Sequence, residues 1–366
     1  MFLCMRILHV ITTLDVGGAE RLMVDLLPLL RNKGFDVELM LFDGVETALK
    51  DEFSKTGIKI HELSRGHQLR NYKKIYNPYN IIRLKNFLKG YDVIHTHNTA
   101  CQYYVPIAAK VASAHLKLVT TEHSSNNRRR KSCWLKPIDK WMYGQYDAII
   151  CISDQTRVNL ENYIGFSNRV FTINNGVNTL RFQRQIKDIS NNSQYIITMV
   201  AGLRMEKDHK TLFRAMLNLP ASYRLQLVGH GERETELKAF CDKNDLNSRV
   251  SFMGLRMDVP DVLEESDIIV LSSHWEGLSL SSIEGMASGR PFIASDVDGL
   301  HEIVKGAGLL FPQGDDKALA EAIRSLCENP EYYHRVAMAC QSRAKEYDIS
   351  VMADKYADLY ESLIVE

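Results

Sequence analysis

Short apolar segments alternate along the chain with longer segments of helical periodicity. In the first half, the apolar runs rich in β-branched residues are Arg6–Ile11, Asp36–Leu41, Asp92–His95, Lys117–Thr121, Ala148–Ile152 and Val170–Ile173. The pattern then restarts with Ile196–Val200, Arg224–Val228, Val250–Phe252, Asp267–Leu271, Pro291–Ala294 and Gly308–Phe311. Strands separated by helix-length segments are typical of βαβ units and parallel sheets. The pattern therefore predicts an α/β protein with two consecutive parallel sheets.

The length and the polar segment between the two patterns predict two domains. A chain of 366 residues exceeds the roughly 250–300 residues that one hydrophobic core supports. Residues 178–193 are polar and have no apolar period, which is typical of a linker. We place the boundary near residue 185, with domains at 1–185 and 186–349. The segment 350–366 has a helical pattern and no strand after it, so we expect it to pack back on the first domain.

Composition narrows the class of protein. Apolar residues make up 45% and charged residues 25% of the chain, which is typical of a soluble globular protein. No run approaches the roughly 18 apolar residues of a membrane-spanning helix, and we recognise no signal peptide. The seven cysteines are scattered without metal-binding spacing. These features predict reduced thiols and a cytoplasmic protein.

The formal net charge is zero, but the two halves differ. Residues 1–183 contain 25 Lys and Arg against 16 Asp and Glu, and the remaining residues are correspondingly acidic. A basic half indicates an anionic partner, such as a phosphate-bearing substrate or an anionic membrane surface. Nucleic acid is disfavoured because no stacking-aromatic or groove-reading motif accompanies the charge.

Ligands of parallel sheets bind beyond the carboxyl ends of the strands, and several loops there carry candidate chemistry. Gly17-Gly18 precedes a helix, where free N–H groups bind anions, although the glycines could simply shape the loop. The segment 202–210 contains cations that suit a diphosphate or a solvated surface. Gly229-His230-Gly231 lacks the third glycine of a dinucleotide-binding fingerprint, which weakens a dehydrogenase interpretation.

The most specific segment contains two glutamates. Glu276 follows a predicted strand, and Glu284 lies in a helix that we expect to begin near Ser279. A carboxylate beyond a strand end can accept hydrogen bonds from sugar or ribose hydroxyls. The free N–H groups of residues 278–281 would face an anion. One loop would therefore bind both a sugar and a phosphate.

These motifs, taken in order, resemble those of a known enzyme family. They are Gly17-Gly18, Asp92-Val93-Ile94-His95-Thr96-His97, Thr121-Glu122-His123, Cys151-Ile152-Ser153, Asn174-Asn175-Gly176-Val177, and Glu276 with Glu284. Over nearly the whole chain, the sequence resembles family 4 of the retaining, nucleotide-sugar-dependent glycosyltransferases, the group 1 glycosyl transferases. The resemblance implies the GT-B architecture, in which two Rossmann-like, doubly wound domains face an inter-domain cleft.

The resemblance also implies roles for individual residues. Glu284 would bind the ribose, Glu276 the hydroxyls of the donor sugar, and Lys207 the diphosphate. His123 would contact the donor sugar, and the implied catalytic residues are His123, Glu276 and Lys207. The implied donor-binding residues are Gly17, Gly18, Arg204, Lys207, Gly229, Gly254, Leu255, Leu278, Ser279, Leu280 and Glu284.

The sequence departs from the family pattern at two positions. The Arg that the family usually has five residues before the phosphate-binding Lys is Gly202 here, so Arg204 is the candidate to replace it. The family's Gly three residues after the first Glu is Ser279, which keeps the backbone donor.

The acceptor side is predicted from a basic and aromatic segment. Cations beside aromatic residues suit an anionic membrane surface or a phosphate-linked lipid, although a solvated basic loop is the alternative. The candidate residues for the acceptor or the membrane are His97, Arg128, Arg129, Arg130, Lys131 and Trp134.

Metal motifs are weak. Asp296-Val297-Asp298 spells a D-x-D sequence but falls in a loop that resembles a glycine-containing loop of the family. His95-x-His97 lacks a third ligand nearby in the sequence, so a structural or acceptor-contacting role is favoured. We therefore expect no metal and no cofactor.

The resulting prediction is a metal-independent hexosyltransferase. It would move a sugar, with retention of configuration, from a nucleotide-sugar, expected to be a UDP-sugar, to a hydroxyl of a glycan or lipid-linked acceptor. The pathway would build cell-surface polysaccharide, such as capsule or lipopolysaccharide, or a glycolipid, at the cytoplasmic face of the inner membrane. The leaving phosphate would accept the acceptor's proton. A UDP-sugar epimerase of the same fold and a non-catalytic nucleotide- or acceptor-binding subunit are the alternatives.

Overall fold

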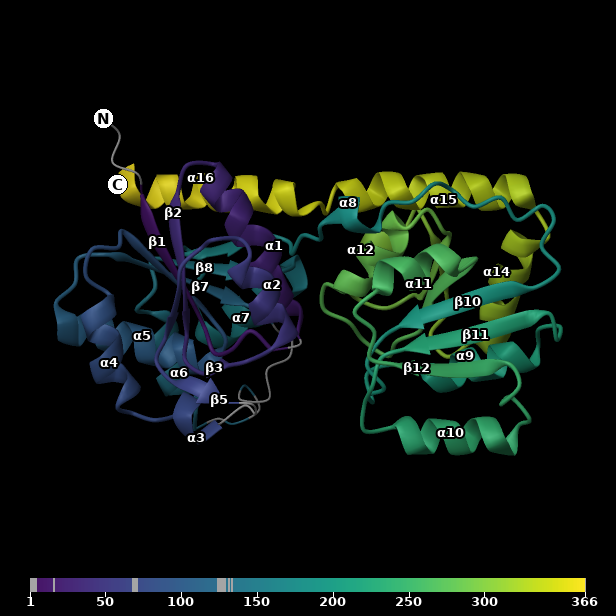
Figure 1. Ribbon diagram of the computed structural model, residues 1–366, viewed down its shortest axis with the longest axis horizontal. Helices are drawn as coiled ribbons and strands as arrows, with labels where there is room; N and C mark the ends of the chain where they lie inside the picture. The colour runs from purple at the N-terminus through teal and green to yellow at the C-terminus, as the bar shows by residue number, and fades with distance from the viewer. Residues whose placement is uncertain are drawn as a thin grey trace. The chain divides into compact units, whose positions relative to one another are not determined.

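The structure is a computed structural model that describes residues 5–15, 17–67, 72–123, 130, 132 and 134–365. Its contacts divide the chain into two units. Unit 1 comprises Met1–Gly176 and Ile349–Glu366, and unit 2 comprises Val177–Asp348. Each unit is built on a parallel sheet with helices on its faces (Figure 1), so the predicted α/β class with two parallel sheets is confirmed.

The sheet of unit 1 has seven strands in the order β4-β2-β1-β6-β7-β8-β9. The strands are β1 (Arg6–Ile11), β2 (Asp36–Leu41), β4 (Ile60–Glu62), β6 (Val93–His97), β7 (Lys117–Glu122), β8 (Ala148–Cys151) and β9 (Val170–Thr172). A separate two-stranded sheet pairs β3 (Gly44–Val45) with β5 (Arg65–His67). The apolar pattern misses β4, because this edge strand has three residues, two of which are the polar His61 and Glu62.

Helices cover both faces of this sheet, because alternate strand residues point to opposite sides. Along β1, Ile7 and Ile11 belong to a core with α1 and α16, whereas Leu8 and Val10 belong to a core with α5. The final helix therefore lies in unit 1, in contact with α1. The helices of unit 1 are α1 (Gly18–Asn32), α2 (Ala48–Ser54), α3 (Tyr72–Ile75), α4 (Asn80–Phe87), α5 (Thr99–Ala112), α6 (Lys136–Tyr143), α7 (Asp154–Ile164) and α16 (Ile349–Val365).

The sheet of unit 2 has six strands in the order β12-β11-β10-β13-β14-β15. The strands are β10 (Tyr195–Val200), β11 (Tyr223–Val228), β12 (Val250–Gly254), β13 (Ile268–Leu271), β14 (Phe292–Ser295) and β15 (Leu309–Phe311). The helices are α8 (Thr179–Phe182), α9 (His209–Leu217), α10 (Glu234–Lys243), α11 (Val259–Glu265), α12 (Leu280–Ala287), α13 (His301–Val304), α14 (Asp316–Cys327) and α15 (Pro330–Lys345).

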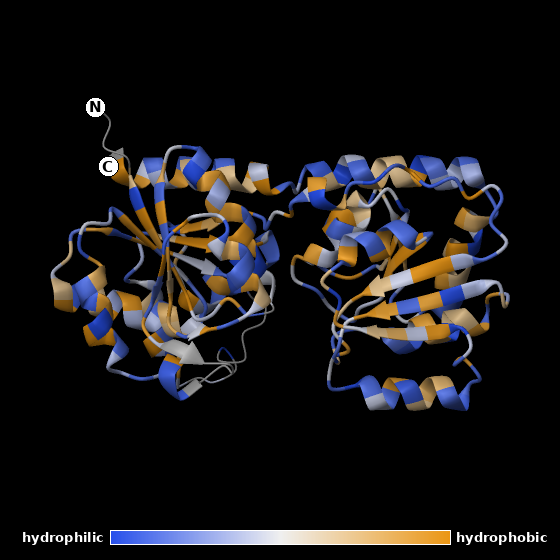
Figure 2. Ribbon diagram, viewed as in Figure 1, coloured by the Kyte–Doolittle hydropathy of each residue, from blue (hydrophilic) through white to orange (hydrophobic). Residues whose placement is uncertain are grey.

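Apolar strands form the centre of each unit, and the helices present polar residues outward (Figure 2). In unit 2, α12 approaches the sheet closely at Gly285. A Cβ atom there would lie 2.9 Å from side-chain atoms of both Ile269 and Phe292. Because those neighbours are rigid core residues, only glycine fits without displacing them.

The boundary lies earlier than the sequence predicts. The polar segment 178–193 contains Phe182 and Ile189, which are buried in the core of unit 2. Unit 2 therefore begins at Val177 rather than near residue 185. The polar composition of this segment is typical of a linker, but its two buried apolar side chains fix it to unit 2. Among the described residues, no helix has the length and apolar character needed to cross a bilayer.

Candidate functional site

Two loops of unit 2 contact each other because they follow β10 and β13, which are neighbours in the sheet. The backbone N–H of Asp208 donates to the carbonyl oxygen of Ser272 at 3.0 Å, and that of His274 donates to Glu206 at 2.8 Å. The Ser272 hydroxyl returns a bond to the Asp208 carbonyl oxygen at 2.8 Å. These bonds hold the two loops as one unit.

The contact between the loops brings together the predicted residues Lys207 and Glu276. Lys207 Nζ and Glu276 Oε1 form an ion pair, and the Ser273 hydroxyl donates to the same carboxylate oxygen at 2.8 Å. The two side chains are only 13% and 11% exposed. A charged pair so shielded from water interacts more strongly than a surface pair.

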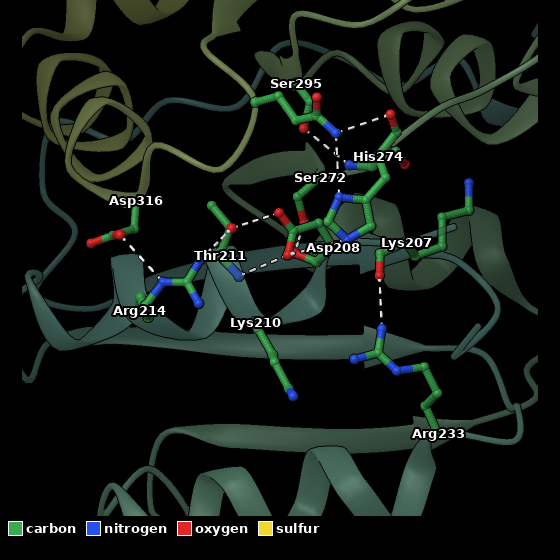
Figure 3. A network of polar contacts seen from close by, with 12 residues as sticks. Lys207, Asp208, Lys210, Thr211, Arg214, Arg233, Ser272, His274, Ser295 and Asp316 are labelled. Atoms are coloured by element: carbon green, nitrogen blue, oxygen red, sulfur yellow. Dashed lines mark hydrogen bonds and ion pairs between the residues drawn. The ribbon is translucent and has the colours of Figure 1, made fainter. Parts of the chain in front are cut away.

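Polar contacts around Lys207 hold its backbone in place (Figure 3). Arg233, which precedes α10, donates a guanidinium hydrogen to the Lys207 carbonyl oxygen at 3.3 Å. Asp208 accepts the backbone N–H of Thr211 at 3.2 Å and its hydroxyl at 2.6 Å, which caps the start of α9. Gln313 donates to the carbonyl oxygen of His274 at 3.0 Å. The Lys207 side chain therefore projects from a rigid support.

The helix start after Glu276 has no side-chain cap, as is also the case at the starts of α10, α11 and α13. Side chains of Asp208, Asp315 and Asn329 cap α9, α14 and α15, but Ser279 makes no capping hydrogen bond to α12. The first N–H groups of α12 therefore have no side-chain acceptor among the described residues. Together with the helix dipole, such groups attract an anion. Glu284 lies in the second turn of the same helix and is partly exposed.

The predicted glycines shape neighbouring loops. At Gly229, with φ +140°, a Cβ atom would lie 2.0 Å from the carbonyl oxygen of Ala201. Gly229 also donates its N–H to the carbonyl oxygen of Gly254 at 2.8 Å. Gly254 has φ +66°, and Leu255 after it is 67% exposed. Only glycine lets the loop after β11 approach the loop after β10 this closely.

The Arg204 side chain lies beside Gly202, the position at which the family usually has an arginine. A Cβ atom on Gly202 would meet Arg204 Nε at 3.3 Å and its Cδ and Cγ at 3.6 Å. The Arg204 side chain is 67% exposed, and its guanidinium lies 4.0 Å from Glu206. Its stem therefore covers the position from which a side chain at residue 202 would extend.

Unit 1 contains a pocket of about 250 Å³ at the ends of its central strands. Its lining includes the predicted His123, and the remaining residues come from the ends of β1, β6 and β7 and from α3 and α5: Thr12, Ile75, Tyr76, Asn98, Thr99, Ala100, Gln102, Thr121 and Glu122. The pocket has a polar, hydrogen-bonding wall.

Behind His123 lies a cluster of buried histidines. His97 Nδ1 lies 3.0 Å from His123 Nε2, and His97 Nε2 lies 3.1 Å from His9 Nδ1. Burial lowers the pKa of His9 to about 3 and that of His123 to about 4, and it holds the pKa of His97 well below its usual range. His97 is 0% exposed. His97 therefore lies one layer behind the pocket, because it points inward from β6, and this position fits the structural role that the sequence left open beside acceptor contact.

The basic and aromatic segment divides into different environments. Arg130 is 11% exposed, with its guanidinium 3.4 Å from the buried Glu122, so it does not present its charge to a surface as predicted. Trp134 is 85% exposed. Arg128, Arg129 and Lys131 lie outside the described residues.

Helix α1 begins directly after the predicted Gly17. The backbone of Gly17 is extended, with φ −177°, and no side chain caps α1 among the described residues. Gly18 is the first residue of α1. This helix start is a second place where free N–H groups meet the end of a strand.

One group of described histidine, cysteine or acidic residues is close enough to hold an ion: His9, His95 and His97, whose ring nitrogens lie within 4.8 Å of one another. Sequence spacing reveals only two of the three, because His9 lies on the neighbouring strand, paired with His95. Asp296 instead contacts His301, with 2.5 Å between its Oδ1 and the histidine Nδ1.

Sequence reasoning missed several residues of both sites. Ser273 and Arg233 support the Lys207–Glu276 pair, and Asn98 and Gln102 line the pocket of unit 1. Each lies within a few residues of a strand end, which was a usable signal. Their partners come from other strands, so the strand order was needed to find them.

Two family profiles match nearly the whole chain. Residues 181–343 match the family described as "Glycosyl transferases group 1", and residues 16–181 match "Glycosyltransferase Family 4". The chain belongs to the group 1 glycosyltransferases. Lys207, Glu276 and Glu284 of this glycosyltransferase lie in the first match, and His123 lies in the second.

Relatives and solved structures cover the same length. A UDP-Gal:alpha-D-GlcNAc-diphosphoundecaprenol alpha-1,3-galactosyltransferase of Escherichia coli is 26% identical, over 98% of this chain and 97% of that protein. A Campylobacter jejuni GalNAc-alpha-(1->4)-GalNAc-alpha-(1->3)-diNAcBac-PP-undecaprenol alpha-1,4-N-acetyl-D-galactosaminyltransferase is 25% identical, over 97% and 98%. Anabaena HepE in complex with UDP-glucose superposes with a TM-score of 0.83 at 20% identity, over 98% of this chain and 100% of that chain. This glycosyltransferase has the predicted GT-B fold.

Proposed function

We propose that this glycosyltransferase transfers a hexose from a UDP-sugar to a lipid-linked glycan, and that unit 2 binds the donor. The observation that carries the proposal is the shielded Lys207–Glu276 ion pair, which shares a loop with the uncapped start of α12. The substrates of similar proteins support the proposal: the Escherichia coli relative takes UDP-Gal and a diphosphoundecaprenol-linked sugar, and HepE was solved with UDP-glucose.

In this proposal each charged group has one task. The diphosphate lies between the Lys207 ammonium and the first N–H groups of α12. Glu276 releases part of its contact with Lys207 and accepts hydrogen bonds from the sugar hydroxyls. Glu284 accepts the ribose hydroxyls. The Ser273 hydroxyl, 2.8 Å from Glu276, keeps the carboxylate oriented during this exchange.

The reaction needs stabilisation of the leaving UDP as negative charge develops on it. Oriented N–H groups and an ammonium that are already in place supply this with little reorganisation. The amide groups of α12, Lys207 and Arg204 form such a set, so we propose that transfer proceeds without a metal ion.

We further propose that the sugar keeps its anomeric configuration. The oxygen of the leaving diphosphate accepts the proton of the acceptor hydroxyl on the face from which UDP departs. The bond from the anomeric carbon to the diphosphate breaks, and the bond to the acceptor oxygen forms on the same face. NMR assignment of the product linkage tests this, since an inverted anomer contradicts it.

An exposed apolar stripe supports attachment to a membrane surface. Trp134, Ile138 and Trp141 are 85%, 50% and 42% exposed and follow a helical spacing of four and three residues. Lys136 and Lys140 lie between them on α6 and are also exposed. Aromatic residues beside lysines are typical of segments that lie on anionic membranes. We propose that this stripe places the enzyme beside its lipid-linked acceptor.

Turnover of the donor tests the proposed function. The purified protein is incubated with UDP-, GDP- and ADP-sugars, each with and without a diphosphoundecaprenol-linked acceptor. We expect release of UDP and extension of the acceptor with a UDP-sugar only, and loss of both in Glu276→Ala. Conversion of the donor sugar without an acceptor would identify an epimerase. Binding of UDP without turnover of any donor would identify a non-catalytic subunit.

A further inference from the structure

A chain of hydrogen-bonded side chains crosses the interior of unit 1 and ends at the pocket. Each member contacts the next through a hydroxyl or a ring nitrogen, and the members in order are Tyr356, Thr121, His95, Tyr360, His9, His97 and His123. We refer to them as the histidine chain. Its two tyrosines lie on α16, and its other members lie on or directly after β1, β6 and β7.

The first half of the histidine chain runs from α16 to the sheet and back. The Tyr356 hydroxyl lies 3.1 Å from the Thr121 hydroxyl, which lies 2.8 Å from His95 Nε2. His95 Nδ1 lies 2.5 Å from the Tyr360 hydroxyl. The second half continues from this hydroxyl to His9 Nε2, at 3.4 Å, and then through His97 to His123 Nε2.

Every member is neutral. Burial lowers the pKa of all four histidines, so none is protonated on both nitrogens near neutral pH. Burial raises the pKa of Tyr356 and of Tyr360, so both keep their hydroxyl hydrogen. Each of the seven members therefore carries one polar hydrogen, and six hydrogen bonds join them.

One hydrogen is left over, and it must lie at one end of the chain. At the Tyr356 end, the side chain is 0% exposed, and its hydroxyl has Thr121 as its one hydrogen-bond partner among the described residues. At the His123 end, Nδ1 belongs to a partly exposed side chain that lines the pocket, where water or a ligand can accept the hydrogen. The state in which the buried Tyr356 hydroxyl hydrogen has no acceptor is therefore less populated than the other state, by a factor of about 5 to 150.

We propose that the histidine chain fixes the tautomer of His123, so that this residue carries its hydrogen on Nδ1 and presents an N–H donor to the pocket. Tyr356 donates to Thr121, and each later member donates to the next, ending with His97 Nδ1–H donating to His123 Nε2. Tyr356 and Tyr360 are positioning residues that act on the ligand through His123.

A metal ion in the same place would require breaking the chain. His9, His95 and His97 are close enough to hold one, but both ring nitrogens of each already have a hydrogen-bond partner. The hydrogen bonds satisfy these nitrogens without an ion. A bound ion would occupy one nitrogen of each ring and displace the hydrogen bond made there, which would interrupt the chain.

The tautomer has a consequence for ligand binding that rests on the proposed function. His123 would donate to an oxygen atom, such as a sugar hydroxyl, rather than accept from it. Asparagine places an amide N–H near the position of Nδ1, so His123→Asn keeps a donor there. We expect kcat to fall about 100-fold in His123→Ala and no more than about 10-fold in His123→Asn. An equal loss in the two variants would contradict a donor role.

The tautomer itself is measured without any substrate. The full-length protein is labelled with ¹⁵N-histidine, and two-bond ¹H–¹⁵N spectra at pH 7.5 identify which ring nitrogen carries hydrogen; His123→Ala assigns the signals. We expect His123 in the Nδ1–H form, in excess over the other form by about 5-fold or more. A predominant Nε2–H form in the wild-type protein would overturn the proposal whatever its activity.

Two matched variants on α16 test the direction of the chain. In Tyr360→Phe, His9 Nε2 has no hydrogen-bond partner in either direction of the chain. The preference for the Nδ1–H tautomer of His123 therefore falls, and both tautomers become visible. In Tyr356→Phe, the Thr121 hydroxyl takes over as the end donor, so His123 keeps the Nδ1–H form. Both variants remove one buried hydroxyl and keep the ring. The same tautomer ratio in both variants would contradict the proposal.

Discussion

The two units place polar residues on or after central strands of their sheets but in opposite electrostatic states. In unit 1 the central strands carry His9 and His95 within β1 and β6 and His97 at the end of β6, and all three are fully buried and neutral. In unit 2 the loops after β10 and β13 carry Lys207 and Glu276, which form an ion pair. Burial without a countercharge favours the neutral form, whereas an ion pair keeps both charges. A shared topology therefore supports a neutral hydrogen-bonding pocket in one unit and a charged site in the other.

This contrast is the reverse of what the charge of the two halves predicts. Residues 1–183 are basic overall, yet the pocket in that half is lined by uncharged groups and Glu122. The acidic half contains the site with Lys207, Arg204 and Arg233 around it. Net charge describes the field far from the surface, so it does not predict the charge of a site that a few buried contacts define.

The largest expected effect is that unit 1 loses more stability than unit 2 at acidic pH. Each buried histidine has a folded-state pKa below its unfolded value of about 6.5. Its contribution to stability is fully present above about pH 6.5 and is lost as the pH falls toward the folded value, by up to about 1.4 kcal/mol per pH unit. Burial lowers the pKa of four histidines in unit 1, which are His9, His95, His97 and His123. In the described part of unit 2, His209 is the one buried histidine, and burial lowers its pKa to about 4.

Hydrogen–deuterium exchange resolved by unit and corrected for its intrinsic pH dependence measures this between pH 7.5 and 5.0. We expect the opening free energy of unit 1 to fall more steeply than that of unit 2. Equal slopes in the two units would mean that the histidines of unit 1 are not held neutral.

The next effect concerns the charged site. Lys207→Ala removes the ammonium that we propose stabilises the leaving diphosphate, so kcat should fall about 100- to 1,000-fold. Lys210→Ala is the matched control, because Lys210 pairs with Glu236 at 2.5 Å and is 38% exposed. Its kcat should stay within about 2-fold of wild type. Steady-state kinetics of both variants measure this; a loss below about 5-fold in Lys207→Ala contradicts the assigned role.

A smaller effect tests the replacement of the missing arginine. Arg204→Ala should lower kcat about 10-fold, because it removes one charge-assisted donor from an exposed position. Adding Gly202→Arg to that variant should restore most of the loss, since Arg204 no longer occupies the space beside Gly202. If the double variant is no better than Arg204→Ala, the guanidinium does not act from this place.

The smallest effect concerns the surface of unit 1. Trp134→Ala with Trp141→Ala should weaken binding to phosphatidylglycerol-containing vesicles about 5-fold, because both side chains are exposed. Val158→Ala, at a 50% exposed apolar residue of α7, is the control and should not change binding. Vesicle sedimentation measures both. Unchanged binding of the double variant would exclude the stripe as the contact surface.

The strands of both sheets were largely predictable because buried parallel strands are continuous apolar runs. Ile268–Leu271, for example, is fully buried. The edge strand Ile60–Glu62 was not predictable, because it has no apolar pattern of its own and is a strand only through its pairing with β2. The segment 178–193 was misleading for a related reason: the two apolar side chains that fix it, Phe182 and Ile189, are too few to give a pattern.

The sequence predicted which loops carry the site residues, but not which of these residues contact each other. Motif spacing located Lys207, Glu276 and Glu284, and the strand order then explained why Lys207 meets Glu276. Sequence could not place His97 one layer behind His123, nor join either to Tyr360, which lies 265 positions beyond its partner His95. The sequence likewise gives no sign that Arg130 is shielded from the surface, since its partner Glu122 precedes it on another element.

The most direct test of the central claim is a crystal structure of the protein with a bound UDP-sugar. We predict that the diphosphate lies within hydrogen-bond distance of Lys207 Nζ and of the first N–H groups of α12, with the ribose hydroxyls on Glu284 and the sugar on Glu276. A nucleotide bound elsewhere, with the Lys207–Glu276 ion pair unchanged, would contradict the account.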